Sequence, residues 1–146
     1  MTAKEYLMQY KKLSTKIKLL EEDIISLTAT IGSVPVPKDK DMPRTRNTSN
    51  TTEDKLVKLI DLKMDRQEAV IKARLKAVEI SETIMSLADT DDPDASTYMR
   101  LLYDRYILLM PWNEVAGCIS YNENYVRGDL HGRALKAITP LIPNTI

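Results

Sequence analysis

The sequence predicts an all-α protein, in which long coiled-coil-like helices are followed by a small C-terminal helix-turn-helix unit. Three observations support this prediction. A seven-residue repeat of apolar side chains runs through the first 31 positions, the chain has no Phe and only four Gly, and residues 95–138 divide into short stretches of helical rhythm. Such a composition is closer to long exposed helices than to a compact mixed core.

The first helix is predicted over residues 3–31. Its apolar residues recur at alternating steps of four and three, and a stripe with this 3.5-residue period winds a helix around a partner helix. The helix should end at Gly32, ahead of Pro35 and Pro37. The stripe consists of Tyr6, Tyr10, Leu13, Ile17, Leu20, Ile24, Leu27 and Ile31.

Residues 32–52 are expected to form a flexible linker, because prolines and small polar residues follow one another there without a helical or strand period. A second helix is predicted over residues 53–88, where "TTED" supplies a capping hydroxyl and first-turn carboxylates. The acidic hinge 89–94, around Pro93, should end this helix. Residues 1–94 are therefore expected to form a helical arm.

The second helix carries an apolar band that is wide enough to need more than one neighbour. The first helix can pair with the second in the same chain or with another copy of the protein, and the sequence leaves this choice open. Because the heptad pattern is long and regular, we expect a homo-oligomer through the N-terminal helices. One side of the band consists of Leu59, Val70, Ala73, Ala77, Ile80, Ile84 and Leu87, and Ile60, Met64, Ile71, Val78 and Met85 lie beside it.

The totals of charge and composition narrow the class of protein. Lys plus Arg is 21 and Asp plus Glu is 21, so the net charge neither supports nor excludes a nucleic-acid partner. No run approaches the roughly 18 apolar residues of a membrane span, and the start lacks the apolar core of a signal peptide. Cys118 is the single cysteine and is expected to be a small buried residue in a reduced, intracellular protein.

Residues 95–146 are predicted to be a separate small domain with its own core. Within it, "EVAGCISYNENYV" matches the demands of a helix-turn-helix, in which Asn122 caps the second helix. Ser120 stands where the turn usually has glycine, so it must take a left-handed backbone or relax the turn. The residues expected to face inward are Val115, Ala116, Val126 and Leu130.

The stretch "LLYDRYILLMPWNEVAGCISYNENYVRGDLHGRALKAI" resembles region 4 of the sigma-70 class. There, a leucine-rich helix ending near an Arg-Tyr precedes a Glu-hydrophobic-Ala helix, and the recognition helix ends in a Leu-His-x-x-Ala pattern. The Trp before Glu-Val-Ala, the "SYNENYV" turn, the "LHGRAL" ending and the start "EYLMQYKKL" are similar to the ArpU and RinA-like late regulators of phages and prophages.

The resemblance implies a sequence-specific DNA-binding protein that regulates transcription of phage genes, most naturally late genes. It also implies double-stranded DNA as partner, a cytoplasmic location in a bacterial host, and activation by recruitment of RNA polymerase. Region 4 modules in sigma factors contact both DNA and the polymerase.

If the second helix of the motif begins at Asn122, its outer face is the candidate DNA-binding surface. Arg127 can make a bidentate contact to guanine or hold a phosphate, and Asn124 can pair with adenine. Glu123 can accept a hydrogen bond from cytosine or favour the positive helix start. Each side chain also has a simpler interpretation as plain surface. The candidate residues are Glu123, Asn124, Arg127, Gly128 and His131.

Two glycines in this helix call for an explanation, because each costs about 1 kcal/mol relative to alanine in a helix interior. At Gly128 a missing side chain would let the backbone approach the groove closely, whereas Gly132 is expected to be a packing glycine. His131, the only histidine, is expected either to contact a phosphate or to be a surface or semi-buried residue. Trp112 is expected to anchor the core of the small domain.

Catalytic patterns are missing from the sequence, which has no glycine-rich phosphate loop, no Cys-His pair beside an orienting group and no metal-ligand spacing. We therefore expect a protein without enzymatic activity, cofactor or metal site. Two other functions stay open. A small-terminase-like DNA packaging protein also joins a helix-turn-helix to an oligomerising helix, and a coiled-coil adaptor would use the same motif to bind protein.

Overall fold

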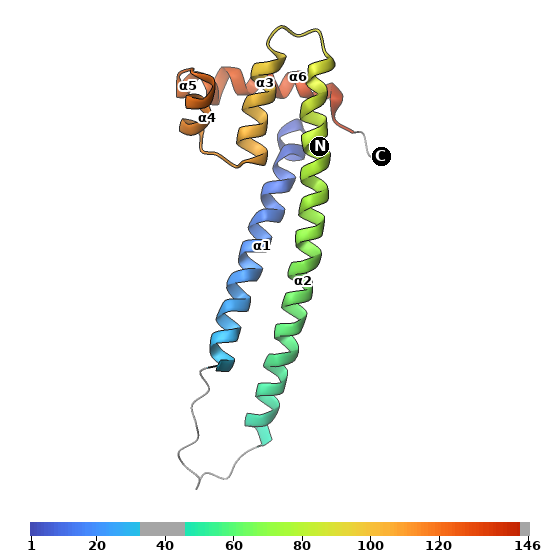
Figure 1. The fold of residues 1–146 in the computed structure, drawn as a ribbon, viewed down its shortest axis with the longest axis vertical. Coiled ribbons are helices and arrows are strands. Elements are labelled where there is room, and N and C mark those ends of the chain that lie inside the picture. Colours follow the sequence, from blue (N-terminus) through green and yellow to red (C-terminus); the bar gives the residue numbers. More distant parts are fainter. Residues whose placement is uncertain (33–45, 144–146) are drawn as a thin grey trace. The chain divides into compact units, whose positions relative to one another are not determined.

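The structure is a computed structural model that describes the backbone of residues 1–32 and 46–143 and the side chains of 1–32 and 52–143 (Figure 1). In these parts of the chain every regular element is a helix, so the predicted all-α class is confirmed. No described helix is both long and apolar enough to cross a bilayer. Most of the predicted linker, residues 33–45, lies outside the described residues.

Helix α1 spans Ala3–Gly32 and ends at the predicted glycine. The start of α1 has a capping box that was not predicted from the sequence. The Thr2 hydroxyl accepts the Glu5 backbone N–H at 3.1 Å, and the Glu5 carboxylate accepts the Thr2 hydroxyl at 3.1 Å. This arrangement satisfies the Glu5 backbone N–H, one of the donors that the first turn of a helix leaves without partners.

Helix α2 spans Arg46–Met85 and is followed by a short 3₁₀ turn over Ser86–Asp89. The helix therefore begins before the predicted residue 53, within the segment that was expected to be linker. Residues 46–52 contain no proline or glycine. Once a helix is nucleated, each such residue costs only a few tenths of a kcal/mol to add, so the polar residues extend the helix instead of ending it.

The described chain divides into two compact units, and neither coincides with the predicted domains 1–94 and 95–146. The core unit consists of Met1–Leu13 with Lys72–Ile146, and the hairpin unit is Ser14–Ile71. The small domain predicted over 95–146 thus lies inside the core unit, which also contains the first turns of α1 and the last turns of α2.

In the hairpin unit, α1 and α2 run antiparallel and side by side (Figure 1). The Arg66 guanidinium donates two hydrogen bonds to one Glu21 carboxylate oxygen, at 2.9 and 2.6 Å. The heptad stripe of α1 is its less exposed side here, from Ile17 to Ile31. In the single chain, the first helix therefore lies beside the second, which is one of the two arrangements that the sequence left open.

The core unit adds four helices to the ends of α1 and α2. The first and third of these elements continue as π-helical turns, at Tyr103–Ile107 and Val126–Leu130. Since α5, the second π-helical turn and α6 follow one another without a break, residues 123–138 form one helix, which we call the C-terminal helix. The added helices are α3 (Ala95–Leu102), α4 (Trp112–Ile119), α5 (Glu123–Tyr125) and α6 (His131–Ile138).

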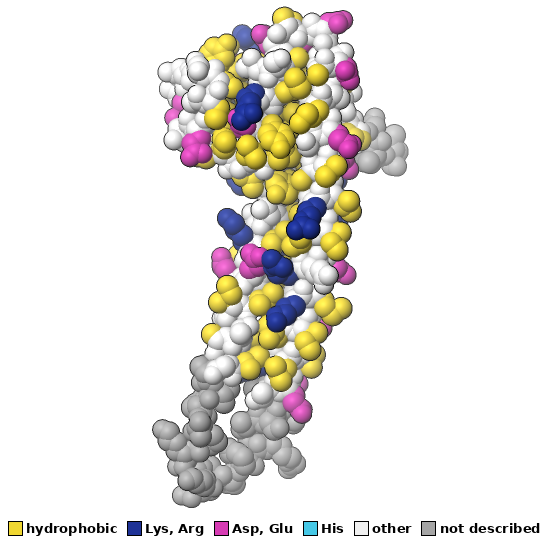
Figure 2. Space-filling view, in the orientation of Figure 1, with side chains coloured by type: hydrophobic (Ala, Val, Ile, Leu, Met, Phe, Trp, Pro, Cys, Tyr) yellow, Lys and Arg dark blue, Asp and Glu magenta, His cyan; other side chains and the backbone are white. Residues whose placement is uncertain are grey.

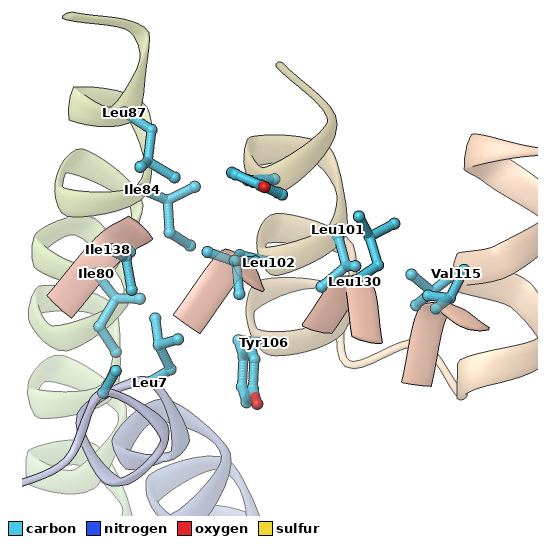
Figure 3. Packing of buried hydrophobic residues seen from close by; sticks show 14 of the residues in the cluster. Leu7, Ile80, Ile84, Leu87, Leu101, Leu102, Tyr106, Val115, Leu130 and Ile138 are labelled. Atoms are coloured by element: carbon cyan, nitrogen blue, oxygen red, sulfur yellow. The ribbon is translucent and has the colours of Figure 1, made fainter. Parts of the chain in front are cut away.

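One hydrophobic cluster explains why the core unit reaches beyond residues 95–146 (Figure 3). Leu7 from α1 and Ile80 and Ile84 from α2 pack with the side chains of the later helices. Burying a side chain of this size contributes roughly 1.5–3 kcal/mol, so the small helices gain stability from the arm. The fully buried aliphatic residues larger than alanine are Leu7, Ile80, Ile84, Leu87, Leu101, Leu102, Val115, Val126 and Ile138.

Candidate functional site

The turn between α4 and the C-terminal helix is made by Ser120. Its backbone lies in the left-handed region, with φ 61° and ψ 41°, which is the first of the two outcomes that the sequence allowed. The Ser120 and Tyr121 backbone N–H groups both bond to the Ala116 carbonyl. The turn therefore keeps the tight geometry expected of glycine, although a non-glycine residue pays roughly 1 kcal/mol for this conformation.

Asn122 starts the C-terminal helix as predicted. Its backbone is extended, and its side-chain oxygen accepts a hydrogen bond from the Asn124 backbone N–H at 2.9 Å. Glu123 follows in the first turn, where a carboxylate is favoured by the helix dipole. The predicted Asn122 cap and the carboxylate in the first turn are thus both present at the start of this helix.

The side chains predicted to hold the two helices together all face inward. The exposed fractions of Val115 and Val126 are 0%, and those of Ala116 and Leu130 are 4%. The small side chain of Ala116 lets α4 lie close to the following helix. These contacts fix which side of the C-terminal helix faces solvent.

Four of the five candidate DNA-binding residues lie together on that outer side. Glu123, Asn124, Arg127 and Gly128 are all exposed. Arg127 donates to the Asn124 side-chain oxygen at 3.1 Å, and its guanidinium lies 3.8 Å from a Glu123 carboxylate oxygen. Three polar side chains therefore form one network, which holds the Arg127 fork over the first turns of the helix.

The structure bears on the explanations offered for the two glycines. A Cβ placed at Gly128 meets no heavy atom within 4 Å, so packing against the described residues does not explain this glycine. The same is true at Gly132, and the expectation of a packing glycine there is wrong. Gly128 lies within the π-helical turn and Gly132 in α6 just after it.

His131 does not lie on the exposed face, so its predicted place on the outer side of the helix is wrong. Only 8% of its surface is exposed, and its Nε2 lies 2.6 Å from the Tyr106 hydroxyl in a hydrogen bond. The π-helical turn accounts for the error, because its wider turn rotates every later residue relative to an uninterrupted α-helix. The rotation brings His131 to the inner side, next to Leu130.

The environment of His131 keeps its imidazole neutral at pH 7. Burial, together with the nearby charges of Lys4 and Arg105, lowers the pKa of His131 to about 4. Burial also raises the pKa of its partner Tyr106 to about 12. The pair is therefore a neutral hydrogen bond inside the core unit.

An aromatic cluster surrounds this histidine. Trp112 contacts the His131 ring edge-on, with ring centroids 4.7 Å apart, and packs against the core as predicted. The Arg105 guanidinium lies over Trp112, 4.4 Å from the ring centroid. Sequence reasoning missed Arg105 and Lys4, because only the folded chain brings them to the C-terminal helix.

Cys118 is exposed, in contrast to the expectation of a buried residue. It lies in the last turn of α4, where Ile119 packs against the core instead. Within the described ranges, no three His, Cys, Asp or Glu side chains are grouped in a way that could hold a metal ion.

Figure 2 shows basic and acidic side chains mixed on one face of the molecule. On the face drawn in Figure 2, basic side chains stand apart from one another among hydrophobic and acidic ones and do not merge into a broad basic patch.

A comparison with known protein families, characterised proteins and solved structures found no match for this chain.

Proposed function

We propose that this chain is a sequence-specific DNA-binding transcriptional regulator of phage genes, in which α4 and the C-terminal helix form a helix-turn-helix. The observation that carries the proposal is the exposed network of Glu123, Asn124 and Arg127 beside the bare backbone of Gly128. The control of late genes and the recruitment of RNA polymerase rest on the resemblance to sigma-70 region 4.

The chemistry of this face suits the edges of base pairs. The major groove admits an α-helix, and an Arg fork can bind the two acceptors of guanine while an Asn amide pairs with adenine. Asn124 already accepts from Arg127, which leaves its NH₂ group and a second lone pair for a base. The face is therefore partly pre-organised before it meets DNA.

Gly128 supports the same proposal through its shape. With no side chain at this position, the C-terminal helix presents backbone directly beside Arg127. At the closest point of a helix in a groove, a missing side chain allows the backbone to approach the DNA, which gives a reason for a glycine that no contact with the described residues requires. The expected cost of that glycine, about 1 kcal/mol, would then be offset on binding.

The proposal is tested with Arg127→Ala on DNA that flanks the protein's own gene. A specific bidentate contact is worth roughly 1–3 kcal/mol of base discrimination, so sequence preference should fall by about 5- to 150-fold. Lys136→Ala is the matched control, since it removes an exposed cation of the same helix outside the predicted face. Protection footprints and circular dichroism provide the measurements. An unchanged footprint with Arg127→Ala would remove Arg127 from the site.

A further inference from the structure

A hollow of about 320 Å³ opens on the core unit next to the proposed DNA-reading face. Three cationic side chains line it, namely Lys4 from α1, Arg105 from the π-helical turn after α3, and Arg127 from the C-terminal helix. No carboxylate is among the lining side chains. The other lining residues are Met8, Tyr106, Trp112 and His131.

Arg105 is held in place from two directions. One guanidinium nitrogen donates to the Met110 backbone carbonyl at 2.9 Å, and the guanidinium plane rests on the Trp112 ring. Trp112 is fixed in turn by its edge-on contact with His131. Because an Arg fork carries five N–H donors, others remain for a ligand, and little side-chain entropy is lost when they bind.

The positive charge of the hollow is only partly compensated. Glu123 lies 3.8 Å from Arg127 and shares that charge, whereas no described carboxylate lies within 4 Å of a Lys4 or Arg105 nitrogen. Burial is the main cause of the lowered pKa of His131, and the charges of Lys4 and Arg105 lower this pKa further. The imidazole stays neutral and adds polarity to the wall without a charge.

We propose that this hollow is a seat for a phosphate group, and that in the DNA complex it holds a backbone phosphate of the bound duplex. This inference rests on the proposed function. Arg127 lies both in the candidate DNA-binding face and in the wall of the hollow, so a duplex on that face would bring its phosphates to Lys4 and Arg105. The start of α1 would then take part in DNA binding.

The test uses Lys4→Ala in the full chain, with Lys12→Ala as the matched control. Both lysines are exposed residues of α1 in the core unit, but only Lys4 lines the hollow. The affinity for random duplex is measured against salt concentration. Each phosphate contact contributes about 0.9 to the slope of log affinity against log salt, so Lys4→Ala should reduce the slope by about that amount and Lys12→Ala should leave it unchanged.

Further outcomes separate this inference from the proposed function. If wild type binds duplex and the slopes of Lys4→Ala and Lys12→Ala agree, the phosphate seat is wrong and the DNA-binding proposal stands. If wild type does not bind duplex, the DNA-binding proposal is wrong, and pyrophosphate becomes the probe. Saturable pyrophosphate binding that Lys4→Ala abolishes would then support a seat for a free phosphate ligand, whereas absent binding would overturn the seat.

A different observation, in the hairpin unit, carries a second inference. The part of the apolar band of α2 that contains Ile60, Met64 and Ile71 is not covered by α1. Along this side Val57 and Ile60 are each 58% exposed, Met64 is 61% exposed and Ile71 is 53% exposed. Together with Gln67 these residues follow steps of three and four, which are the a and d positions of a coiled coil. We call them the outer stripe.

The charges beside the outer stripe fit a second copy of the chain. If Val57 is an a position, Lys63 is a g position and Asp61 and Glu68 are e positions, and all three are exposed. In a parallel pair, Lys63 of each copy faces Glu68 of the other, whereas an antiparallel pair would bring the acidic e positions together. The same patch on both copies gives a closed two-fold interface.

We infer that the outer stripe is covered by a second copy in parallel register, so that the two α2 helices pair and each keeps its own α1 on its other side. Sedimentation equilibrium should give a dimer for wild type and a monomer for Met64→Glu, with the dimer kept in Lys58→Glu, which changes an exposed side chain beside the stripe. Lys63→Glu should weaken the dimer, and the added change Glu68→Lys should restore it. A monomeric wild type, or a dimer that survives Met64→Glu, would overturn the inference.

Discussion

His131 and Arg127 lie four residues apart on one helix and have opposite environments. Arg127 is exposed within a polar network, and His131 is buried against Tyr106 and Trp112. The prediction from the sequence placed both residues on one face, because it used the 3.6 residues per turn of an uninterrupted α-helix for the whole segment. The difference assigns His131 to stability and leaves Arg127 as the candidate for base contact.

The burial of His131 predicts how stability depends on pH. Its folded-state pKa of about 4 lies below the ordinary value of 6.5, so the folded state favours the neutral imidazole. The contribution is complete above pH 6.5 and is lost as the pH falls toward 4, which amounts to at most about 3 kcal/mol. His131→Gln removes the titration, and urea denaturation at pH 7 and pH 4.5 measures the effect. An equally steep loss in wild type and His131→Gln would contradict it.

At the scale of the element, the start of the C-terminal helix depends on the single cap at Asn122. The first α-helical stretch, Glu123–Tyr125, is short and is followed at once by the π-helical turn. A short stretch gains little from its own hydrogen bonds, because helix nucleation is unfavourable. The cap and the inward contacts of Val126 and Leu130 together place the exposed face.

Loss of the Asn122 cap should lower the unfolding free energy by a measurable amount. Asn122→Ala removes the acceptor of the Asn124 N–H bond, and loss of such a cap costs roughly 1 kcal/mol of unfolding free energy. Asn122→Asp keeps a side-chain oxygen in the same place and should retain most of that stability. Urea denaturation compares the two variants. Equal losses in both would indicate that the cap is not the source of the effect.

At the scale of the whole molecule, the core unit is assembled from both ends of the chain. Tyr6 donates a hydrogen bond to Glu79 at 2.9 Å, and its hydroxyl lies 3.0 Å from that of Thr83. Leu7 is fully buried among residues of α2 and the later helices. The predicted small domain therefore shares its core with the helical arm.

This organisation predicts a large effect for a residue that is distant from the C-terminal helix in sequence. Leu7→Ala should lower the unfolding free energy by roughly 2–5 kcal/mol, as expected for a large-to-small change in a core. Ile25→Ala, at a position of α1 that is 69% exposed, should change it by less than about 0.5 kcal/mol. Trp112 fluorescence follows the unfolding of the core unit. A small effect of Leu7→Ala would exclude α1 from that core.

The mass of the assembly separates the proposed function from its alternatives. A dimer held by the outer stripe agrees with a regulator that carries two reading helices, whereas a ring of eight or more copies would agree with a small-terminase-like packaging protein. Light scattering of wild type distinguishes these states. An adaptor that binds only protein would show no salt-dependent affinity for duplex DNA.

Local patterns in the sequence were sufficient for the features that neighbouring residues decide. The all-α class, the end of α1 at Gly32 and the Asn122 cap all depend on contacts within a few residues. The inward positions of Val115 and Val126 follow from helical period in the same way. Such features are determined by backbone sterics and local hydrogen bonds, so the sequence by itself predicts them.

Tertiary structure decided the features that depend on distant residues. The pairing of α1 with α2, the sharing of the core with Leu7, the rotation of His131 by the π-helical turn and the convergence of Lys4 with Arg105 and Arg127 each join segments far apart in the chain. Packing energy selects among helical registers that differ little in local propensity. Because a π-helical turn changes the rotation per residue, the sequence period predicts the exposed face of a helix only as far as the first such turn.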